Sequence, residues 1–175
     1  MGHESQSITG DVTLWQPNRV TVGICDQKVA IVADTNLVTY ALGSCVAIML
    51  HDANRRAAGL LHFMLPDSSL NPSKAEMRPG MFADTGLTAL LQELSSKGIL
   101  ARNLTARLVG GGALKGMGAT FAIGTNNQAA ARSLLEAARI RVVAEDLGGN
   151  RSRSVFMHAG SGRVLVRSPS GEYEL

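Results

Sequence analysis

Two apolar runs joined by a short polar turn constrain the fold of this chain more than any other feature. Residues 46–50 are continuously apolar, and residues 57–65 are apolar again apart from a single histidine, His62. The segment between them, Asp52-Ala53-Asn54-Arg55, has the composition of a turn. This arrangement predicts a β-hairpin. Cys45 immediately precedes the first run, so the predicted hairpin carries both a thiol and an imidazole.

The register of this hairpin decides whether Cys45 and His62 meet. A tight turn on Ala53-Asn54 would pair Cys45 directly with His62, and directly opposed residues have Cβ atoms about 5 Å apart on the same face. A slip of one residue would place the two side chains on opposite faces. Alternatively, Cys45 begins a short helix whose N-terminal amides favour a thiolate. Both geometries support a thiol–imidazole pair.

Such a pair has an obvious chemical use and an equally simple structural alternative. A free thiol has a pKa near 8.5, so a neighbouring imidazole that takes its proton creates a thiolate nucleophile. Gly43 and Ser44 allow a tight backbone turn and leave an amide free to face an oxyanion. In the structural interpretation, Cys45 begins a core strand and His62 is a buried, hydrogen-bonded histidine. Spacing alone favours this second interpretation, because buried cysteines are common.

The other candidate sites are weaker. Cys25 falls in a predicted strand without a nearby histidine and is interpreted as structural, and no C-x-x-C motif supports a Cys25–Cys45 redox pair. The glycine-rich segment 110–118 matches neither phosphate-binding motif, so it is predicted to be a turn or a loop that lines the substrate site. Arg151 and Arg153 fit an acidic partner or a solvated loop equally well. The four histidines are scattered, which argues against a metal site.

Composition indicates a globular intracellular protein. Hydrophobic residues make up 45% of the 175 residues and the net charge is only +3, with scattered basic residues, so nucleic-acid binding is not expected. Two cysteines are too few for a secreted disulfide framework, and no apolar run is long enough for a signal peptide or a membrane span. We therefore expect a cytoplasmic protein without membrane insertion. Residues 1–18 are predicted to be a flexible extension, of which only Trp15 docks onto the domain, and residues 19–175 a single domain.

The order of predicted elements indicates an α+β fold. Val20 to Ile24 and Val29 to Val32 alternate around a polar turn and predict a first hairpin, and segment 66–77 is predicted to be a non-helical polar loop because of Pro72 and Pro79. Apolar spacing and end signals predict helices over 82–97 and 127–138, the second capped by Thr125 or Asn126. Further strands are predicted at 37–40, 104–109, 140–145, 154–158 and 163–167. Eight or nine strands and two main helices do not alternate strictly, so the class is α+β rather than doubly wound α/β.

Several motifs in order resemble those of the bacterial chemoreceptor glutamine deamidases, the CheD family. They span residues 19–168 and leave only the two ends unmatched. The matching segments are Val38-Thr39-Tyr40-Ala41-Leu42-Gly43-Ser44-Cys45-Val46-Ala47, Gly59-Leu60-Leu61-His62-Phe63-Met64-Leu65-Pro66-Asp67, Phe82-Ala83-Asp84-Thr85, Gly110-Gly111-Gly112-Ala113, Ile123-Gly124-Thr125-Asn126 and Ala144-Glu145-Asp146-Leu147-Gly148-Gly149-Asn150-Arg151. Tyr40-Ala41 departs from the smaller or glycine-containing residues of the family pattern, and the N-terminal extension is longer.

The resemblance implies a three-layer α/β/β sandwich and a site made of Cys45 as nucleophile, His62 as general base and acid, and Thr39 orienting His62. It implies deamidation of glutamine side chains on the cytoplasmic helices of chemotaxis receptors, without a metal or organic cofactor. It also implies a CheC-type phosphatase as a regulatory partner of some members. The alternative is a non-catalytic module that regulates such a phosphatase or a receptor, and a thiol redox sensor is a further alternative.

Overall fold

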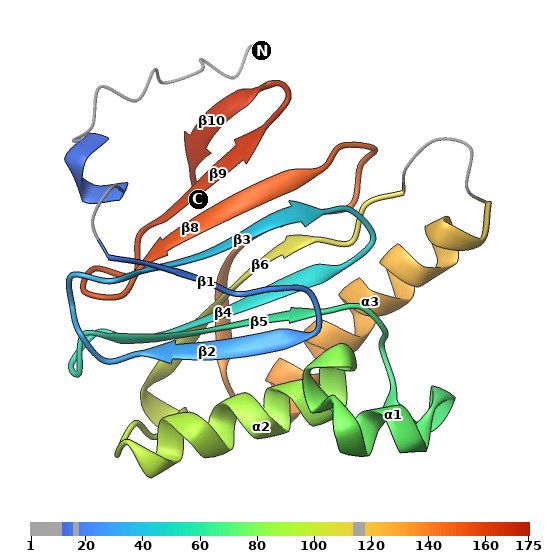
Figure 1. Ribbon diagram of the computed structural model, residues 1–175, viewed down its shortest axis with the longest axis horizontal. Helices are drawn as coiled ribbons and strands as arrows, with labels where there is room; N and C mark the ends of the chain where they lie inside the picture. Colours follow the sequence, from blue (N-terminus) through green and yellow to red (C-terminus); the bar gives the residue numbers. More distant parts are fainter. Residues whose placement is uncertain (1–11, 16–17, 114–117) are drawn as a thin grey trace.

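The two predicted core strands lie in the middle layer of a three-layer sandwich (Figure 1). The computed structural model describes residues 12–15, 18–113 and 118–175, which form ten strands and three α-helices. The sheet that contains these strands, called the central sheet, has the order β2 (Asp26–Ala30), β5 (Ala57–Phe63), β4 (Val46–Asp52), β6 (Leu104–Gly110) and β7 (Arg141–Leu147).

The other two layers cover the two faces of the central sheet. The outer sheet has the order β1 (Arg19–Thr21), β3 (Asn36–Leu42), β8 (Arg153–His158), β9 (Val164–Ser168) and β10 (Gly171–Glu174). The opposite face is covered by α2 (Ala83–Ser96) and α3 (Gly118–Ala137), with the short α1 (Pro72–Met77) beside them (Figure 1). The prediction of an α+β sandwich is confirmed.

Burial on both faces explains why the core strands have apolar residues at every position. Along β4, Val46 and Ile48 pack against the helical layer, whereas Ala47 and Met49 pack against the outer sheet. Along β5, Leu61 faces the helices and Leu60 faces the outer sheet. Because successive strand residues point to opposite faces, a strand covered on both sides needs apolar side chains throughout.

The hairpin of β4 and β5 is present, but its register is shifted from the predicted one. The turn contains four residues, 53–56, and it pairs His62 with Ala47 rather than with Cys45. The Asp52 carboxylate accepts hydrogen bonds from the amides of Asn54 (3.0 Å) and Arg55 (3.1 Å), and Arg56 has a positive φ of 51°. These features stabilise the longer turn. The predicted pairing was wrong by two residues, and a shift of two keeps Cys45 on the same face as His62.

The predicted first hairpin is also wrong. β1 pairs in parallel with β3 of the outer sheet, whereas β2 pairs antiparallel with β5 of the central sheet. The chain crosses between the sheets through a turn at Ile24 and Cys25, where Cys25 has a φ of 61°. Cys25 therefore lies in this turn. The prediction that it lies in a strand is wrong. The later hairpin of β8 and β9 is confirmed, with Ser154 opposite Arg167.

Two helical segments differ from prediction. The expected loop contains α1, because Pro72 occupies the first turn, where a missing N–H costs nothing, and the Asn71 side chain caps the amide of Lys74 at 3.1 Å. Three short 3-10 turns accompany the helices: η2 (Ser68–Leu70), η3 (Pro79–Met81) and η4 (Ala101–Asn103). α3 begins at Gly118, well before the predicted start at Asn127. None of the helices in the described part of the chain is long and apolar enough to cross a membrane.

Trp15 docks onto the outer sheet, as predicted. It ends the 3-10 turn η1 (Val12–Trp15) and is only 7% exposed, packed with Val38, Phe156 and Leu165 on the face of the outer sheet away from the central sheet. The Trp15 carbonyl also accepts a hydrogen bond of 2.9 Å from Arg19 Nε. Residues 1–11 and 16–17 of the predicted extension lie outside the described residues, so the boundary at residue 18 stays a prediction.

Replacing Trp15 by Ala is expected to lower the free energy of unfolding by about 3 kcal/mol, because a large buried side chain is lost from a packed cluster. Urea denaturation followed by circular dichroism measures this change. Leu70→Ala is the control, since Leu70 is 61% exposed and its loss should change stability by less than about 0.5 kcal/mol. Equal effects of the two substitutions would show that the docking of Trp15 does not stabilise the domain.

Candidate active site

A hydrogen bond between the two sheets joins two of the predicted site residues. Thr39 on β3 and His62 on β5 both point into the layer between the sheets, and Thr39 Oγ1 lies 2.7 Å from His62 Nδ1. Thr39 is fully buried and His62 is 3% exposed. Thr39 lies in the outer sheet and His62 in the central sheet, so packing of the two sheets brings them together.

The contacts of Thr39 determine the tautomer of His62. Thr39 Oγ1 also lies 2.7 Å from the backbone carbonyl oxygen of Val22, which can only accept a hydrogen bond. The single hydroxyl proton is therefore donated to Val22, and the hydroxyl oxygen accepts the proton of His62 Nδ1–H. This leaves Nε2 unprotonated in the neutral ring. Nε2 is buried and has no hydrogen-bond partner among the described residues, so its lone pair is available as a base.

Cys45 lies in the same layer as His62, immediately before β4. It is 8% exposed and belongs to the apolar core between the sheets. Ala47 is directly opposite His62, so Cys45 lies at the diagonal position on the same face. Diagonal neighbours have Cβ atoms about 7 Å apart, a separation that an imidazole can span. The structure thus places Thr39, Cys45 and His62 in one layer, with the thiol nearest to its edge.

Burial keeps both the thiol and the imidazole uncharged. It raises the pKa of Cys45 to about 11, with a smaller contribution from Cys25, and the backbone amide of Cys45 opposes this shift. Burial also lowers the pKa of His62 to about 4. At neutral pH the resting pair is therefore thiol and neutral imidazole rather than the ion pair expected from sequence. A base in this state takes the thiol proton only as the sulfur attacks.

The turn before Cys45 is fixed through its carbonyl groups. The carbonyl oxygen of Gly43 accepts a hydrogen bond from the amide of Gly112 (2.7 Å), and that of Cys45 accepts one from the amide of Gly111 (2.8 Å). Gly110 has a φ of +119°, and a Cβ atom at this position would lie 2.2 Å from the Cys45 carbonyl oxygen. Glycine is required at position 110 because the two backbones approach so closely.

Asn127 is a site residue that the sequence analysis missed. It lies within α3, is fully buried, and its Nδ2 donates to the carbonyl oxygens of Ser44 and Met64, both at 2.9 Å. One amide thus connects the turn before Cys45 to the end of β5. Because asparagine is unfavourable inside helices, its position in the middle of a helix could have identified it. The predicted helix began at Asn127, so this signal was hidden.

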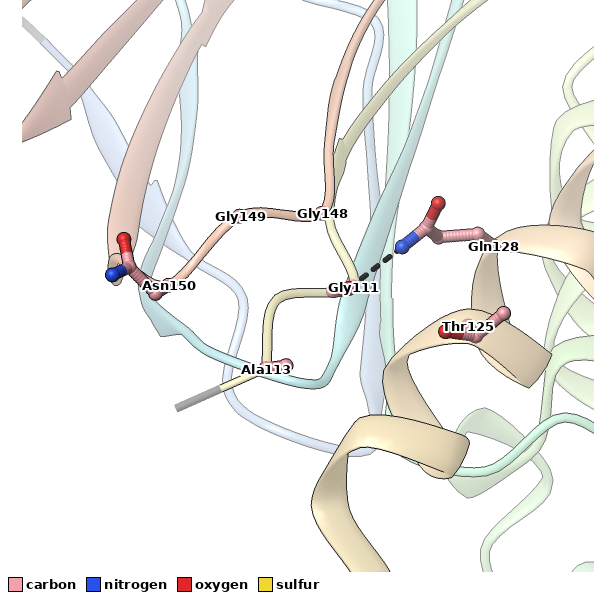
Figure 2. Close-up of a pocket in the computed structure, with 7 residues that line it drawn as sticks. All are labelled: Gly111, Ala113, Thr125, Gln128, Gly148, Gly149 and Asn150. Atoms are coloured by element: carbon pink, nitrogen blue, oxygen red, sulfur yellow. Dashed lines mark hydrogen bonds between the residues drawn. The ribbon is translucent and has the colours of Figure 1, made fainter. Parts of the chain in front are cut away.

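The glycine-rich loop after β6 lines a cavity of about 330 Å³ next to the turn (Figure 2). Gly111 and Ala113 contribute to it from this loop, Thr125 and Gln128 from α3, and Gly148, Gly149 and Asn150 from the loop after β7. Gln128 Nε2 donates to the Gly111 carbonyl oxygen at 2.7 Å (Figure 2). The loop thus supports the Cys45 turn and borders an open space beside it, which fits the predicted lining loop. Residues 114–117, including Lys115, lie outside the described residues.

The loop after β7, which contains Gly148 and Gly149, is called the second glycine loop. Arg153 holds it in place from inside the protein. Its guanidinium makes two hydrogen bonds to the Asp146 carboxylate (2.6 and 2.8 Å) and one to the Gly148 carbonyl oxygen (2.9 Å), and only 2% of its side chain is exposed. Burial raises the pKa of Asp146, but hydrogen bonds from Arg153 and Tyr173 outweigh burial and hold this pKa below its ordinary value. The interpretation of Arg153 as a solvated or partner-binding residue is wrong. Arg151 is partly exposed and lies 3.4 Å from the same carboxylate.

Cys25 does not pair with Cys45. The amide of Cys25 donates to the His62 carbonyl oxygen at 2.8 Å, and β5 lies between the strands that follow the two cysteines. Their Cα atoms are therefore separated by about two strand spacings, roughly 9.5 Å, which exceeds the 7 Å or so that a disulfide can bridge. Both thiols are free. The described part of the chain also contains no group of three His, Cys, Asp or Glu side chains that could hold a metal ion.

Comparison with known proteins identifies the family of this chain. The family model described as CheD chemotactic sensory transduction matches residues 64–168. A probable chemoreceptor glutamine deamidase CheD 2 of Anaeromyxobacter dehalogenans strain 2CP-C is 45% identical over 149 residues, which cover 85% of this chain and 94% of that protein. A probable chemoreceptor glutamine deamidase CheD of Solibacter usitatus strain Ellin6076 is 37% identical over 157 residues, covering 90% and 93%. The chain belongs to the CheD family.

The matched span of the family model begins at Met64, two residues after His62. Thr39, Cys45 and His62 therefore precede it, whereas Asn127 and both glycine loops lie inside it. The catalytic roles of the first three residues consequently remain predictions, based on their geometry and on the motifs around them.

Replacing Thr39 by Val should lower kcat by about 10²-fold with little change in KM. The substitution preserves volume but removes the acceptor of His62 Nδ1–H, so the tautomer with a free Nε2 is no longer favoured. Thr39→Ser retains the hydroxyl and should keep most of the activity. Steady-state kinetics on a receptor fragment measure both variants. Equal activity of Thr39→Val and wild type would contradict the orienting role.

The pKa of Cys45 predicts how fast it is alkylated at each pH. In a Cys25→Ser background, the rate of iodoacetamide modification at Cys45 should rise about tenfold per pH unit from pH 7 to 10, because the thiolate fraction grows in this way below the pKa. Mass spectrometry of the modified peptide gives the rate. A rate that is already constant below pH 8 would instead show that the resting pair is a thiolate–imidazolium ion pair.

Proposed function

We propose that this protein is a deamidase that converts glutamine side chains of chemotaxis receptors to glutamate with release of ammonia. One geometric observation carries the chemistry: the Thr39–His62 hydrogen bond leaves a buried Nε2 lone pair in the layer that contains Cys45. The substrate comes from the relatives, which are named as probable chemoreceptor glutamine deamidases.

The first half-reaction is acyl transfer to sulfur. His62 Nε2 takes the proton of the Cys45 thiol as the sulfur attacks the carboxamide carbon of the glutamine. Backbone amides of the Ser44–Cys45 turn stabilise the oxyanion, and loss of one such donor typically costs about 3 kcal/mol. The imidazolium then protonates the leaving nitrogen, the C–N bond breaks, and ammonia departs. The product of this half is a thioester on Cys45.

Hydrolysis of the thioester completes the cycle. His62, again neutral, takes a proton from water as the water oxygen attacks the thioester carbon. Collapse of the intermediate breaks the C–S bond, and the proton on His62 returns to sulfur. Thr39 acts through its hydroxyl and holds His62 Nδ1–H throughout, so the same nitrogen serves both half-reactions. Protein side chains supply every proton transfer in this scheme, which uses no metal or organic cofactor.

The shape of the site agrees with a protein substrate. Cys45 is near the edge of its layer. The cavity of about 330 Å³ beside its turn is lined by three glycines and by Ala113, Thr125, Gln128 and Asn150, none of which is aromatic or a large aliphatic residue. A side chain carried on a receptor helix can therefore approach without displacing large residues. We place this reaction in the cytoplasm, where the receptor helices are, with a CheC-type phosphatase as a regulatory partner.

Incubation with a receptor cytoplasmic fragment should convert specific glutamines to glutamates, as detected by mass spectrometry. Cys45→Ala should abolish the conversion because it removes the nucleophile. Cys25→Ser should leave activity near that of wild type, since Cys25 lies in a turn on the far side of β5. Conversion that persists in Cys45→Ala would exclude the thioester mechanism. Unchanged receptor glutamines together with intact phosphatase binding would favour the non-catalytic module.

A further inference from the structure

An apolar pocket of about 290 Å³ lies on the other side of the proposed active site from the glycine-lined cavity. Its lining residues are Ile24, Cys25, Met64, Lys74, Met77, Arg78 and Met81. They come from the crossing between β1 and β2, from the end of β5, and from α1 and η3. In Figure 1, α1 lies at the same end of the molecule as the β3–β4 turn that precedes Cys45.

Two direct contacts connect this pocket to the site. The amide of Cys25, in the pocket wall, donates to the carbonyl oxygen of His62 at 2.8 Å. Met64 packs against the inter-sheet core that contains Cys45, and its carbonyl oxygen is held by the same Asn127 amide that holds Ser44. A side chain bound in the pocket is therefore next to the strand end and the turn that position the thiol and the imidazole.

The pocket is bordered by apolar side chains that the fold leaves exposed. Met77 is 75% exposed and Ile24 is 51% exposed. Exposed apolar residues that gather around a hollow mark interaction sites more often than scattered ones do. Three of the seven lining residues are methionines. Methionine surfaces adapt to partner side chains of different shapes, which suits an enzyme that recognises several positions on similar helices.

Two cations, Lys74 and Arg78, flank the apolar surface. Lys74 and Met77 are three residues apart and share one face of α1, and Arg78 follows directly as the C-cap of the helix. All three line the pocket, whereas Glu76 of the same helix does not. Across residues 12–15, 18–113 and 118–175, no salt bridge includes Lys74 or Arg78. An apolar pocket with two cations beside it is complementary to an amphipathic helix that carries carboxylates around an apolar residue.

We propose that this pocket docks the receptor helix that bears the target glutamine, with an apolar side chain of the helix inside the pocket and acidic side chains against Lys74 and Arg78. This inference rests on the proposed function, because it identifies the surface by which the same substrate is held. Docking at the pocket would raise the local concentration of glutamine at Cys45 without contributing to bond breaking. Its loss should therefore appear in KM and in binding rather than in kcat.

Binding can be measured without turnover in a Cys45→Ala background. The probe is a fluorescently labelled cytoplasmic fragment of a receptor, and anisotropy gives its Kd. Met77→Asp and the double variant Lys74→Glu/Arg78→Glu are each expected to weaken binding by about tenfold or more. Added salt should weaken wild-type binding and reduce the difference from the double variant, because part of the attraction is electrostatic.

Matched control variants make the same changes in net charge, but at residues near the opposite end of the central sheet. Val32→Asp replaces an apolar residue that is 62% exposed after β2, and Arg102→Glu/Arg139→Glu reverses two exposed cations that precede β6 and β7. Both should keep Kd within about twofold of the unaltered protein. The fold of the site is checked by introducing the same substitutions into the protein that retains Cys45. There the rate of Cys45 alkylation should be the same for wild type, pocket variants and controls.

The outcomes separate docking from catalysis. Pocket variants and controls that bind equally well would overturn the docking proposal, even if wild type deamidates the fragment. If the wild-type protein converts no glutamine but the pocket variants still bind the fragment more weakly, the proposed function is contradicted. The docking proposal is then still supported. A pocket variant that dissociates a dimer of this chain in sedimentation, while fragment binding stays intact, would assign the pocket to self-association and overturn the proposal.

Discussion

The hydrogen bond between Thr39 and His62 is the interaction on which the proposed site depends. It crosses between the two sheets, within the apolar layer that packs them together, and it fixes which imidazole nitrogen carries the proton. A buried imidazole without such a partner could adopt either tautomer, and its burial would only disfavour charge. With Thr39 donating to Val22, the free nitrogen is defined before any substrate arrives. The arrangement requires the two sheets to be aligned, so the packing of the whole sandwich determines the chemistry of one ring.

The proposed reactive residues come from an early part of the chain, and the groups that hold them come from a later part. Asn127 and the glycine loop after β6 contact the carbonyls of the turn before Cys45, and the loop after β7 in turn accepts a hydrogen bond from the amide of Ala113. The Arg153–Asp146 pair anchors this second loop. These supports lie within the span that the CheD family model matches. The span matched by the family model therefore covers the framework around the proposed nucleophile and not Cys45 itself.

Much of this could be predicted from the sequence because apolar patterning is local. Two short apolar segments around a glycine-containing turn at 159–162 identified β8 and β9, and leucine spacing with Gly98 identified α2. The register of the β4–β5 hairpin could not be obtained in this way, because it depends on the Asp52 carboxylate stabilising a four-residue turn. Nor could the separation of β1 and β2 into different sheets, which depends on a left-handed Cys25 rather than on apolar pattern. α1 was missed because Pro72 was taken to exclude a helix, although at a first helical position it favours one.

The site residues also fall into those that the sequence pattern predicts and those that only the fold reveals. Cys45 and His62 were found because each interrupts or borders an apolar run, and Thr39 followed from the resemblance to a family. The partners of Asn127 and Arg153 could not be predicted, since they are backbone groups and a carboxylate that only the fold brings near. The charge states of Cys45 and His62 also required the structure, because they follow from the depth of burial.

The dependence of the Cys45 turn on residues up to Arg153 has a consequence for the order of events during synthesis. Thr39, Cys45 and His62 leave the ribosome early, but the amides that fix the turn belong to Gly111, Gly112 and α3. The second glycine loop is completed only at Arg153. A nascent chain that has emerged only through β5 carries every proposed reactive group and none of these supports. Its thiol is then an ordinary cysteine, so the nascent protein gains its specific chemistry only when the last third of the chain has emerged and folded.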